Sequence, residues 1–466
     1  WTAATGATRY YVYKLSNGLY GYIGQTQGTT FKDDNIAADV SVTPPEINDP
    51  FLGTGNYPAA VSYFEQRRCF GGTLNAPQTL WMTRSGTESN LNYSIPTRDD
   101  DSIQFRVAAR EANTIRHIVP LQELVLLTSS AEWRVTSINS DAITPTSFSV
   151  KPQSYVGANN VQPVIVNNNL IFAAARGGHV RELGYSGQAG GYMTGDLSVR
   201  APHLFDNLEI TDMAFAKAPQ QIIWMVSTNG KLLGLTYVPE HNVGSWHQHD
   251  TDGLFESCTV VSEGSEDVLY VVVKRTIGGA TQRYVERMAS RQFATAADAF
   301  FVDSGLTYSG TPVTTLSGLG HLEGKTVNIL ADGAVHPQRV VTSGAISLDV
   351  EASKVHVGLP ITADLQTLPL AFEAEAYGQG RVKNVNQAWL RVYRSSGIFV
   401  GPNPSELVEA KQRTTEPYGS PPALKSEEIQ VTLTPTWADS GSVYVRQSDP
   451  LPLTVVSMTL EVSVGS

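Results

Sequence analysis

Charged residues and cysteines are both scarce in this chain of 466 residues. Only 17% of the residues are Asp, Glu, Lys or Arg and the net charge is -11, whereas an ordinary soluble protein is about 25% charged. Neither a disordered tail nor a nucleic-acid-binding surface has this composition. The two cysteines, Cys69 and Cys258, allow at most one disulfide and exclude a zinc site built from cysteines. We therefore expect a fold that is held together by packing.

Long apolar runs are also missing from the sequence. No window reaches the roughly 18 continuous apolar residues that a membrane-spanning helix needs, and no secretory leader is recognisable. The numbering begins at Trp1 instead of a methionine, so we expect the chain to be part of a longer or processed polypeptide. At a prior of about 150 residues per domain, the length suggests roughly three folding units.

Short β-strand patterns, in contrast, are abundant and recur along the chain. The repeated unit is an apolar strand, a small polar turn and a second, amphipathic strand; its copies start at residues 124, 170, 222 and 268, with a more degenerate copy around 63–82. A period of about 40 to 50 residues with four strands per repeat is typical of β-propeller blades. We predict about five blades, or six if distant strands complete a ring, with the apolar strand as the inner one. A generic β-sandwich is the alternative.

The remaining segments predict further β modules. A hairpin around Asn17-Gly18 suggests part of a fibronectin type III module, and the segment 41–57, rich in proline and glycine, is predicted to be a linker. Alternation of Ile103, Phe105 and Val107 indicates a strand where composition alone would allow a helix. Four strands near the C-terminus are expected to form one sheet: 388–393, 428–435, 442–446 and 453–464.

The predicted fold class is therefore all-β, with a β-propeller body and additional small β-sandwich or β-barrel-like domains and no long helix. We predict a partial fibronectin-III-like β module, a β-propeller, a small glycine-rich β domain and a C-terminal platform-like β-sheet domain. Their predicted bounds are residues 1–45, 46–300, 301–370 and 371–466, respectively.

A phosphate-binding loop is suggested by Gly320-His321-Leu322-Glu323-Gly324-Lys325-Thr326 but does not fit the requirements. Such a loop needs four residues between its glycines and a helix after it, whose first amides face the phosphate. Here the residues 327–330, followed by Asp332-Gly333, have the pattern of a strand and a turn. We expect no nucleotide cofactor.

Two polar clusters contain residue types that can bind a metal. His247 and His249 would point the same way on a strand, but a metal normally takes three or four protein ligands and the nearest further histidine is His241. Hydrogen-bonded surface or inter-blade histidines are the better interpretation. The run Asp99-Asp100-Asp101 lacks the spacing of a calcium loop. We interpret it as an exposed acidic turn or a charged contact between subunits, and no metal is predicted.

Catalytic residues are not assigned. No Gly-x-Ser-x-Gly nucleophile elbow exists, and both cysteines lie in apolar, strand-like surroundings typical of inert thiols. Propeller glycosidases use an acid pair or a tyrosine nucleophile. The candidate acids lie at expected strand ends, but nothing in the sequence brings two of them together: Glu132, Glu182, Glu240, Glu256 and Glu286.

Particular strings across the chain resemble the tail nozzle, or tail tubular protein B, family of short-tailed bacteriophages. They include Gln66-Arg67-Arg68-Cys69-Phe70-Gly71-Gly72 and its continuation to residue 81, and Asn229-Gly230-Lys231-Leu232-Leu233-Gly234. Further matching strings lie at residues 84–86, 99–103, 196–198, 283–287, 318–324 and 446–453. The strings occur in the order that the family has. The front of the chain departs from the family, whose members have a longer N-terminal region.

The resemblance implies a mechanical role without catalytic residues. It implies a hexameric ring at the distal end of the virion tail, stacked on an adaptor ring, in contact with tail fibres, and enclosing the channel through which double-stranded DNA leaves. A net charge of -11 agrees with a channel that does not hold phosphate. The alternative from a different class is a carbohydrate-binding or glycan-hydrolysing propeller that serves as a tail adhesin.

Overall fold

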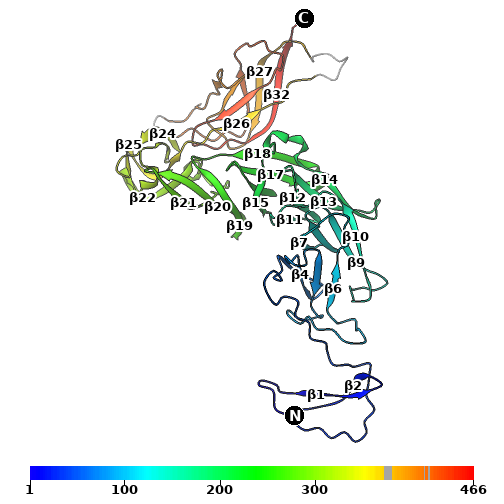
Figure 1. The fold of residues 1–466 in the computed structure, drawn as a ribbon. Coiled ribbons are helices and arrows are strands. Elements are labelled where there is room, and N and C mark those ends of the chain that lie inside the picture. Colours follow the sequence, from blue (N-terminus) through cyan, green and yellow to red (C-terminus); the bar gives the residue numbers. More distant parts are fainter. Residues whose placement is uncertain (372–379, 414, 418–419, 466) are drawn as a thin grey trace. The chain divides into compact units, whose positions relative to one another are not determined.

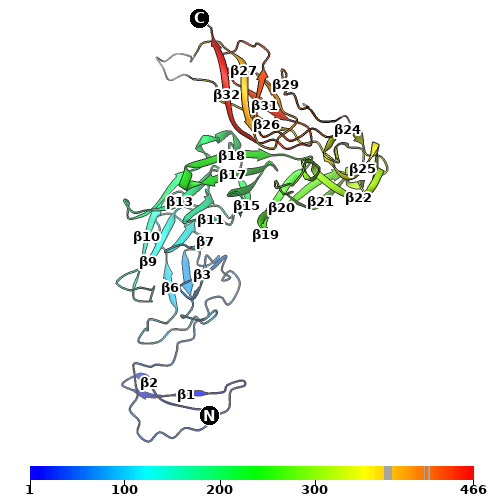
Figure 2. The same cartoon turned by 180° about the vertical axis from the view of Figure 1, so that it is seen from behind.

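The structure is a computed structural model that describes residues 1–371, 380–413, 415–417 and 420–465 (Figures 1 and 2). It is 50% strand and 3% helix, so the all-β prediction is confirmed. The helices of the described residues are three-residue turns, and none of them has the length and apolarity needed to cross a bilayer. The chain forms two compact units, residues 1–250 with 255–260, and residues 251–254 with 261–466.

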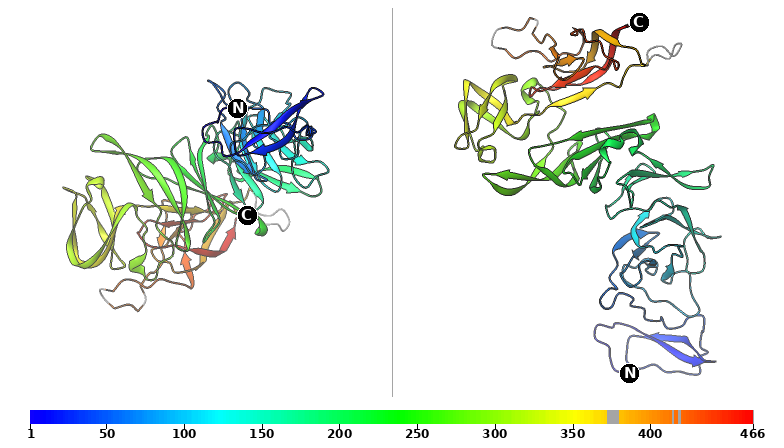
Figure 3. Two further views of the ribbon diagram at one scale, coloured as in Figure 1. Left: turned by 90° about the horizontal axis from the view of Figure 1, so that it is seen from below. Right: turned by 45° about the horizontal axis from the view of Figure 1, so that its top comes forward.

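Most of the first unit consists of four consecutive antiparallel meanders of four strands each, the sheet pattern of propeller blades. The green sheet β15–β18 can be followed in Figure 3. The first two meanders contain β3 (Ala60–Phe64), β4 (Arg67–Gly71), β5 (Thr79–Met82), β6 (Ile103–Arg106), β7 (Ile115–Pro120), β8 (Leu124–Thr128), β9 (Glu132–Ser137) and β10 (Phe148–Ser154). The next two contain β11 (Val164–Val166), β12 (Asn169–Ala173), β13 (Val180–Ser186), β14 (Gly191–Asp196), β15 (Ile210–Ala216), β16 (Ile222–Ser227), β17 (Leu232–Val238) and β18 (Val243–His249).

The repeat found in the sequence corresponds to the second and third strands of these sheets. The apolar strands are β8, β12 and β16, which have a partner strand on each side, so they are inner strands of their sheets, as predicted. All residues of β8 and β16 are buried. A strand that is covered on both faces is apolar at consecutive positions instead of alternate ones, which is why these strands dominated the sequence pattern.

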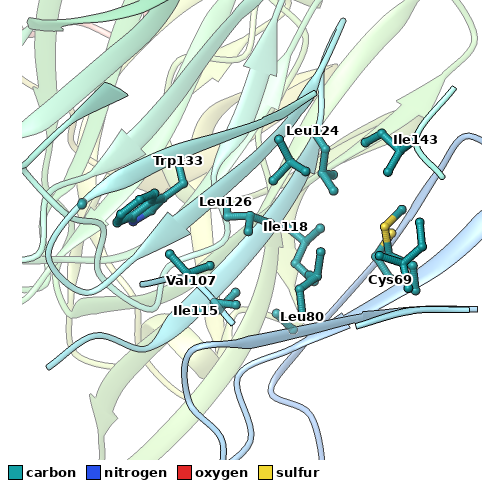
Figure 4. Close-up of a cluster of buried hydrophobic side chains, with 14 residues drawn as sticks. Cys69, Leu80, Val107, Ile115, Ile118, Leu124, Leu126, Trp133 and Ile143 are labelled. Atoms are coloured by element: carbon teal, nitrogen blue, oxygen red, sulfur yellow. The ribbon is translucent and has the colours of Figure 1, made fainter. Parts of the chain in front are cut away.

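Neighbouring meanders pack face to face through cores that share a strand. Leu124 and Leu126 of β8 join the core between the first and second meanders (Figure 4), whereas Val125 and Leu127 join the core between the second and third. The strand β12 divides in the same way between that core and the next one. Because successive side chains of a strand point to opposite faces, one apolar strand builds two cores, and the sheets stack in chain order as blades do.

The N-terminal hairpin also forms as predicted. Its strands are β1 (Tyr10–Ser16) and β2 (Leu19–Thr26), joined by Asn17 and Gly18 with positive φ values of 48° and 85°. The predicted linker, residues 41–57, contains no strand and is tied to the first meander by an isolated bridge between Glu46 and Tyr93. The predicted strand near Ile103 is β6.

The second unit contains a hairpin, a four-stranded sheet and a C-terminal pair of sheets. The hairpin is formed by β20 (Glu266–Ile277) and β21 (Ala280–Arg287), and β19 (Leu254–Glu263) precedes it with residues in both units. The sheet has the order β22-β25-β23-β24. Its strands are β22 (Asp303–Ser317), β23 (Thr326–Ala331), β24 (Ala334–Val340) and β25 (Ala345–Leu359). Since a strand follows Thr326, the interpretation of residues 327–330 as a strand is confirmed.

The C-terminal residues form two sheets where one was predicted. Three of the four predicted strands pair in the order β30-β27-β32, but the segment around 444 joins the other sheet, β26-β31-β28-β29. One apolar core includes residues of both sheets, so either pairing would bury the same side chains, and their sequence pattern could not decide between them. The strands are β26 (Ala363–Gln366), β27 (Lys383–Val392), β28 (Phe399–Gly401), β29 (Val408–Glu409), β30 (Glu428–Thr432), β31 (Tyr444–Gln447) and β32 (Val455–Val464). The four-domain division stays a prediction.

Candidate functional site

The acidic turn is a structural feature of the first meander. Asp99 and Asp100 are exposed, as predicted, but Asp101 is fully buried, so the expectation of three exposed carboxylates was wrong. The Asp101 carboxylate accepts hydrogen bonds from the backbone N–H groups of Ser94 and Arg98, both at 2.9 Å. Through these bonds the backbone of the turn closes around the Asp101 carboxylate. A side chain buried in this way cannot contact another subunit, whereas contacts of Asp99 and Asp100 stay a prediction.

Beneath the turn lies Arg67, whose role the sequence did not reveal. Its guanidinium is 3% exposed and donates to the backbone carbonyl oxygens of Thr83 at 2.8 Å, Asp101 at 2.5 Å and Asp99 at 2.7 Å. Burial lowers the pKa of Arg67. Five N–H donors in a rigid fork are suited to holding several carbonyls at once, so Arg67 connects β4 to the end of β5 and to the acidic turn.

The two predicted histidines of β18 lie side by side, as their spacing indicated. The Nδ1 atom of His247 is 2.9 Å from Nε2 of His249, and both rings lie 5.5 Å from the ring of Trp224 on β16. The His247 ring covers Gly234 on the intervening strand, where a Cβ would collide with it. The pair is therefore hydrogen-bonded and packed, as we predicted. No group of three or more His, Cys, Asp or Glu residues able to hold a metal occurs among the described residues.

Three of the candidate acids are each bound to a residue that is not another acid. Glu240 accepts from Asn167, and Glu286 on β21 forms a bidentate ion pair with the buried Arg275 at 2.7 and 2.8 Å. Glu182 accepts a short hydrogen bond from the hydroxyl of Tyr237. Glu256 lies on β19. Glu240 is thus bound to an amide, Glu286 to a cation and Glu182 to a hydroxyl group.

Glu182 and Tyr237 are the residue types of a general base and a tyrosine nucleophile. The surroundings of Tyr237, however, do not favour its acting as a nucleophile. Tyr237 is 4% exposed, its hydroxyl also accepts from Asn169 at 2.9 Å, and burial and the Glu182 contact raise its pKa. A nucleophile needs the opposite shift and access to substrate. We interpret the pair as a polar contact between β13 and β17.

Glu132 is the most unusual of the acids because it is fully buried. Its Oε2 accepts from the Ser154 hydroxyl and from the Val156 amide, whereas Oε1 is buried without a hydrogen-bond partner in the described part of the chain. Burial raises the pKa of this carboxyl group. Burial therefore makes the charged form of this carboxyl group less favourable than it is in water.

This raised pKa predicts how stability depends on pH. The contribution of Glu132 is fully present below the pKa of the unfolded chain and is lost as the pH rises through the folded-state pKa, by about 1.4 kcal/mol for each unit of difference. We expect Glu132→Gln to remove this loss and to be at least as stable as the parent at pH 7. Urea unfolding from pH 4 to 8 measures it. A Gln variant less stable at pH 7 by more than about 1 kcal/mol would contradict the assignment.

Both cysteines are free and buried, as predicted. Burial raises the pKa of the Cys69 thiol to about 12, and burial also raises that of Cys258. Because the thiolate is the reactive form, neither residue is poised for nucleophilic chemistry.

A small pocket in the second unit has a cavity volume of about 10 Å³, far below the roughly 300–1,000 Å³ of ligand sites. It is lined by Ser396, Gly397, Ile398, Ala410, Lys411, Gln412, Lys425 and Ile429.

A group of exposed apolar side chains lies in and after the N-terminal hairpin. Of residues 1–42, all of which the structure describes, only Gly21 and Ile23 are buried. A third of the exposed large hydrophobic side chains of the described residues lie in the first 63 positions: Trp1, Tyr11, Leu15, Leu19, Tyr20, Ile36, Val40, Ile47, Leu52, Tyr57, Val61 and Tyr63. A two-stranded hairpin is at best marginally stable in water. The segment therefore buries few of its own apolar side chains.

Among the comparisons with known proteins, only solved structures match the chain. No family model and no curated protein matches the chain. Among solved structures, a luciferin-regenerating enzyme is 11% identical with a TM-score of 0.29, covering 66% of this chain and 92% of that one. Raptor of Chaetomium thermophilum is 10% identical with a TM-score of 0.28, covering 65% and 27%. The GH32 β-fructofuranosidase of Bombyx mori is 9% identical with a TM-score of 0.20, covering 88% and 90%.

Proposed function

We propose that this chain is a structural subunit that assembles into a closed ring, the tail nozzle of a short-tailed bacteriophage. The observation that carries the assembly role is the N-terminal segment, in which only two of the first 42 residues are buried while aromatic and aliphatic side chains lie exposed. Exposed apolar surface of this kind marks protein contacts. A head-to-tail contact between copies closes into a ring when the rotation between them is a simple fraction of a turn.

The identity of the ring is supported by the strings that resemble the nozzle family and by the all-β fold with its blade-like meanders. In this proposal the ring is a hexamer in the distal tail of the virion. It stacks on an adaptor ring, contacts tail fibres and lets DNA pass without specific binding. The acidic balance of the chain favours such a channel, because each Lys or Arg contact to phosphate would add affinity and slow the passage of DNA.

The mass of the purified chain in solution tests the proposal. We expect native mass spectrometry to give six times the mass of the chain and negative-stain images to show rings. A monomer that binds or cleaves a glycan would instead establish the carbohydrate-handling alternative. Rings whose channel wall is predominantly Lys and Arg would contradict the proposed passage of DNA.

A further inference from the structure

The β1–β2 hairpin has two different faces, which its register defines. Tyr13 lies opposite Tyr22, and Leu15 lies opposite Tyr20, so these side chains share one face. Lys14 lies opposite Gly21, and Val12 opposite Gly24, on the other face. An irregularity after Val12 accommodates one extra residue in β2, which keeps the tyrosines of the two strands together.

The second of these faces is covered by the chain itself. A Cβ at Gly24 would come within 2.6 Å of the Phe31 ring, and one at Gly21 within 2.7 Å of the Asp39 backbone. Lys14 forms an ion pair with Asp33 at 2.9 Å. The glycines thus serve a close approach of residues 31–40, and this face needs no further partner.

The opposite face, which we call the tyrosine face, consists of Tyr11, Tyr13, Leu15, Tyr20 and Tyr22. Tyr11, Leu15 and Tyr20 are 58%, 57% and 53% exposed. A face of a hairpin that is meant for water carries polar side chains, yet this one is made of aromatic and aliphatic residues. Its area is on the order of 400 Å², about half of the roughly 800 Å² that each partner contributes to a standard interface.

We propose that the tyrosine face is the contact by which each subunit binds a second copy of this chain. The proposal rests on the proposed function and names the surface that builds the ring. Tyrosine is enriched in the centres of protein interfaces, because it buries a large area with few rotatable bonds.

Charge favours a second copy as the occupant. Residues 1–42 contain three cations and three anions, so this segment is neutral within a chain of net charge -11. Copies of an acidic chain repel one another least where they are neutral. The occupant is then a chain of net charge -11, so the partner is acidic as a whole.

The geometry of the rings disfavours a sugar as the occupant. The ring of Tyr22 is inclined by 63° to that of Tyr11 and by 69° to that of Tyr13, with centroids 6.0 Å apart in both pairs. Edge-to-face rings do not form the flat platform on which a sugar ring stacks, but they interdigitate well with protein side chains.

The test compares a triple variant with a matched control in the full chain. Tyr11→Thr, Leu15→Thr and Tyr20→Thr keep the β propensity of the hairpin and leave its covered face intact. The control carries Val285→Thr, Val350→Thr and Val456→Thr, which are exposed to a similar degree, at 73%, 71% and 61%. We expect the triple variant to raise the dissociation constant between copies at least a hundredfold and the control to change it less than threefold. Native mass spectrometry across a dilution series measures both.

Single charge variants keep the proposal testable if the triple variant does not fold. With an acidic partner, Tyr11→Glu weakens assembly more than Tyr11→Lys, and the difference shrinks in 1 M salt. Equal effects of both charges on assembly, or a triple variant that assembles like the parent, would overturn the inference while leaving the ring function in place. A parent chain that is monomeric at all concentrations would instead overturn the ring function. A parent that binds a glycan through this face would overturn the inference in favour of a sugar.

Discussion

Replacing Arg67 with methionine is expected to destabilise the first unit by about 3–5 kcal/mol. Methionine fills much of the same volume but has no donors. The buried carbonyl oxygens of Thr83 and Asp101 would then lose the donor that Arg67 provides, and so would the partly buried carbonyl oxygen of Asp99. Each unsatisfied carbonyl costs about 1–3 kcal/mol. Urea unfolding followed by tryptophan fluorescence measures the loss, because Trp81 and Trp133 lie in the same part of the first unit.

The neighbouring arginine provides the control. Arg68 lies at the surface, where it bonds the hydroxyl of Tyr63 at 2.9 Å and pairs with Glu88 at 2.6 Å. Exposed pairs of this kind are worth about 0–1 kcal/mol, so Arg68→Met should leave stability nearly unchanged. Equal effects of the two substitutions would show that the buried carbonyls under the acidic turn do not depend on the guanidinium.

Placing alanine at Gly178 is expected to be nearly as damaging, at about 3–5 kcal/mol. Gly178 has a φ of +68° in the turn between β12 and β13, and a Cβ there would collide with the Leu208 carbonyl oxygen. The positive φ alone costs a residue with a side chain about 1–2 kcal/mol. The collision adds more, because a backbone carbonyl at the start of the next meander cannot move aside like the end of a side chain. Thermal unfolding is the measurement.

Two glycines in the turn between β13 and β14 distinguish the cost of a positive φ from the cost of a collision. Gly190 has a φ of +63° but open space around its Cβ position, and Gly187 has open space without a positive φ. We expect Gly190→Ala to cost about 1 kcal/mol and Gly187→Ala almost nothing. If Gly178→Ala costs no more than Gly190→Ala, the close packing between the third and fourth meanders is not as tight as the structure describes.

The blades were predictable because their signal is local. A strand that is apolar at consecutive positions, such as β8 or β16, can be recognised within a few residues, and so can the turn after it. The outer strands carry a weaker signal because they are exposed on one side, as in β10 or β21. The sequence therefore showed the apolar strand and its hairpin partner, whereas the strand on the other side of the apolar strand carried too weak a signal to be recognised.

The polar contacts were predictable only in part. The histidines of β18 are two residues apart, and strand geometry alone brings them together. The contacts of Arg67 with Asp99 and of Tyr237 with Glu182 join residues 32 and 55 positions apart. No pattern within the sequence indicates such contacts, because they depend on how neighbouring strands and sheets are placed.

The sequence by itself determined that this chain is all-β, that its strands come in hairpins at blade-like intervals, and that its thiols are inert. Hydrophobic alternation and turn residues act over a few positions, and they carry this information directly. The tertiary structure alone decided which acid of the Asp99-Asp100-Asp101 run is buried, which sheet takes the strand at Tyr444, and which face of the hairpin is left uncovered. These outcomes depend on long-range pairing and burial, in which many arrangements satisfy the same local pattern and the packing of the whole unit selects one.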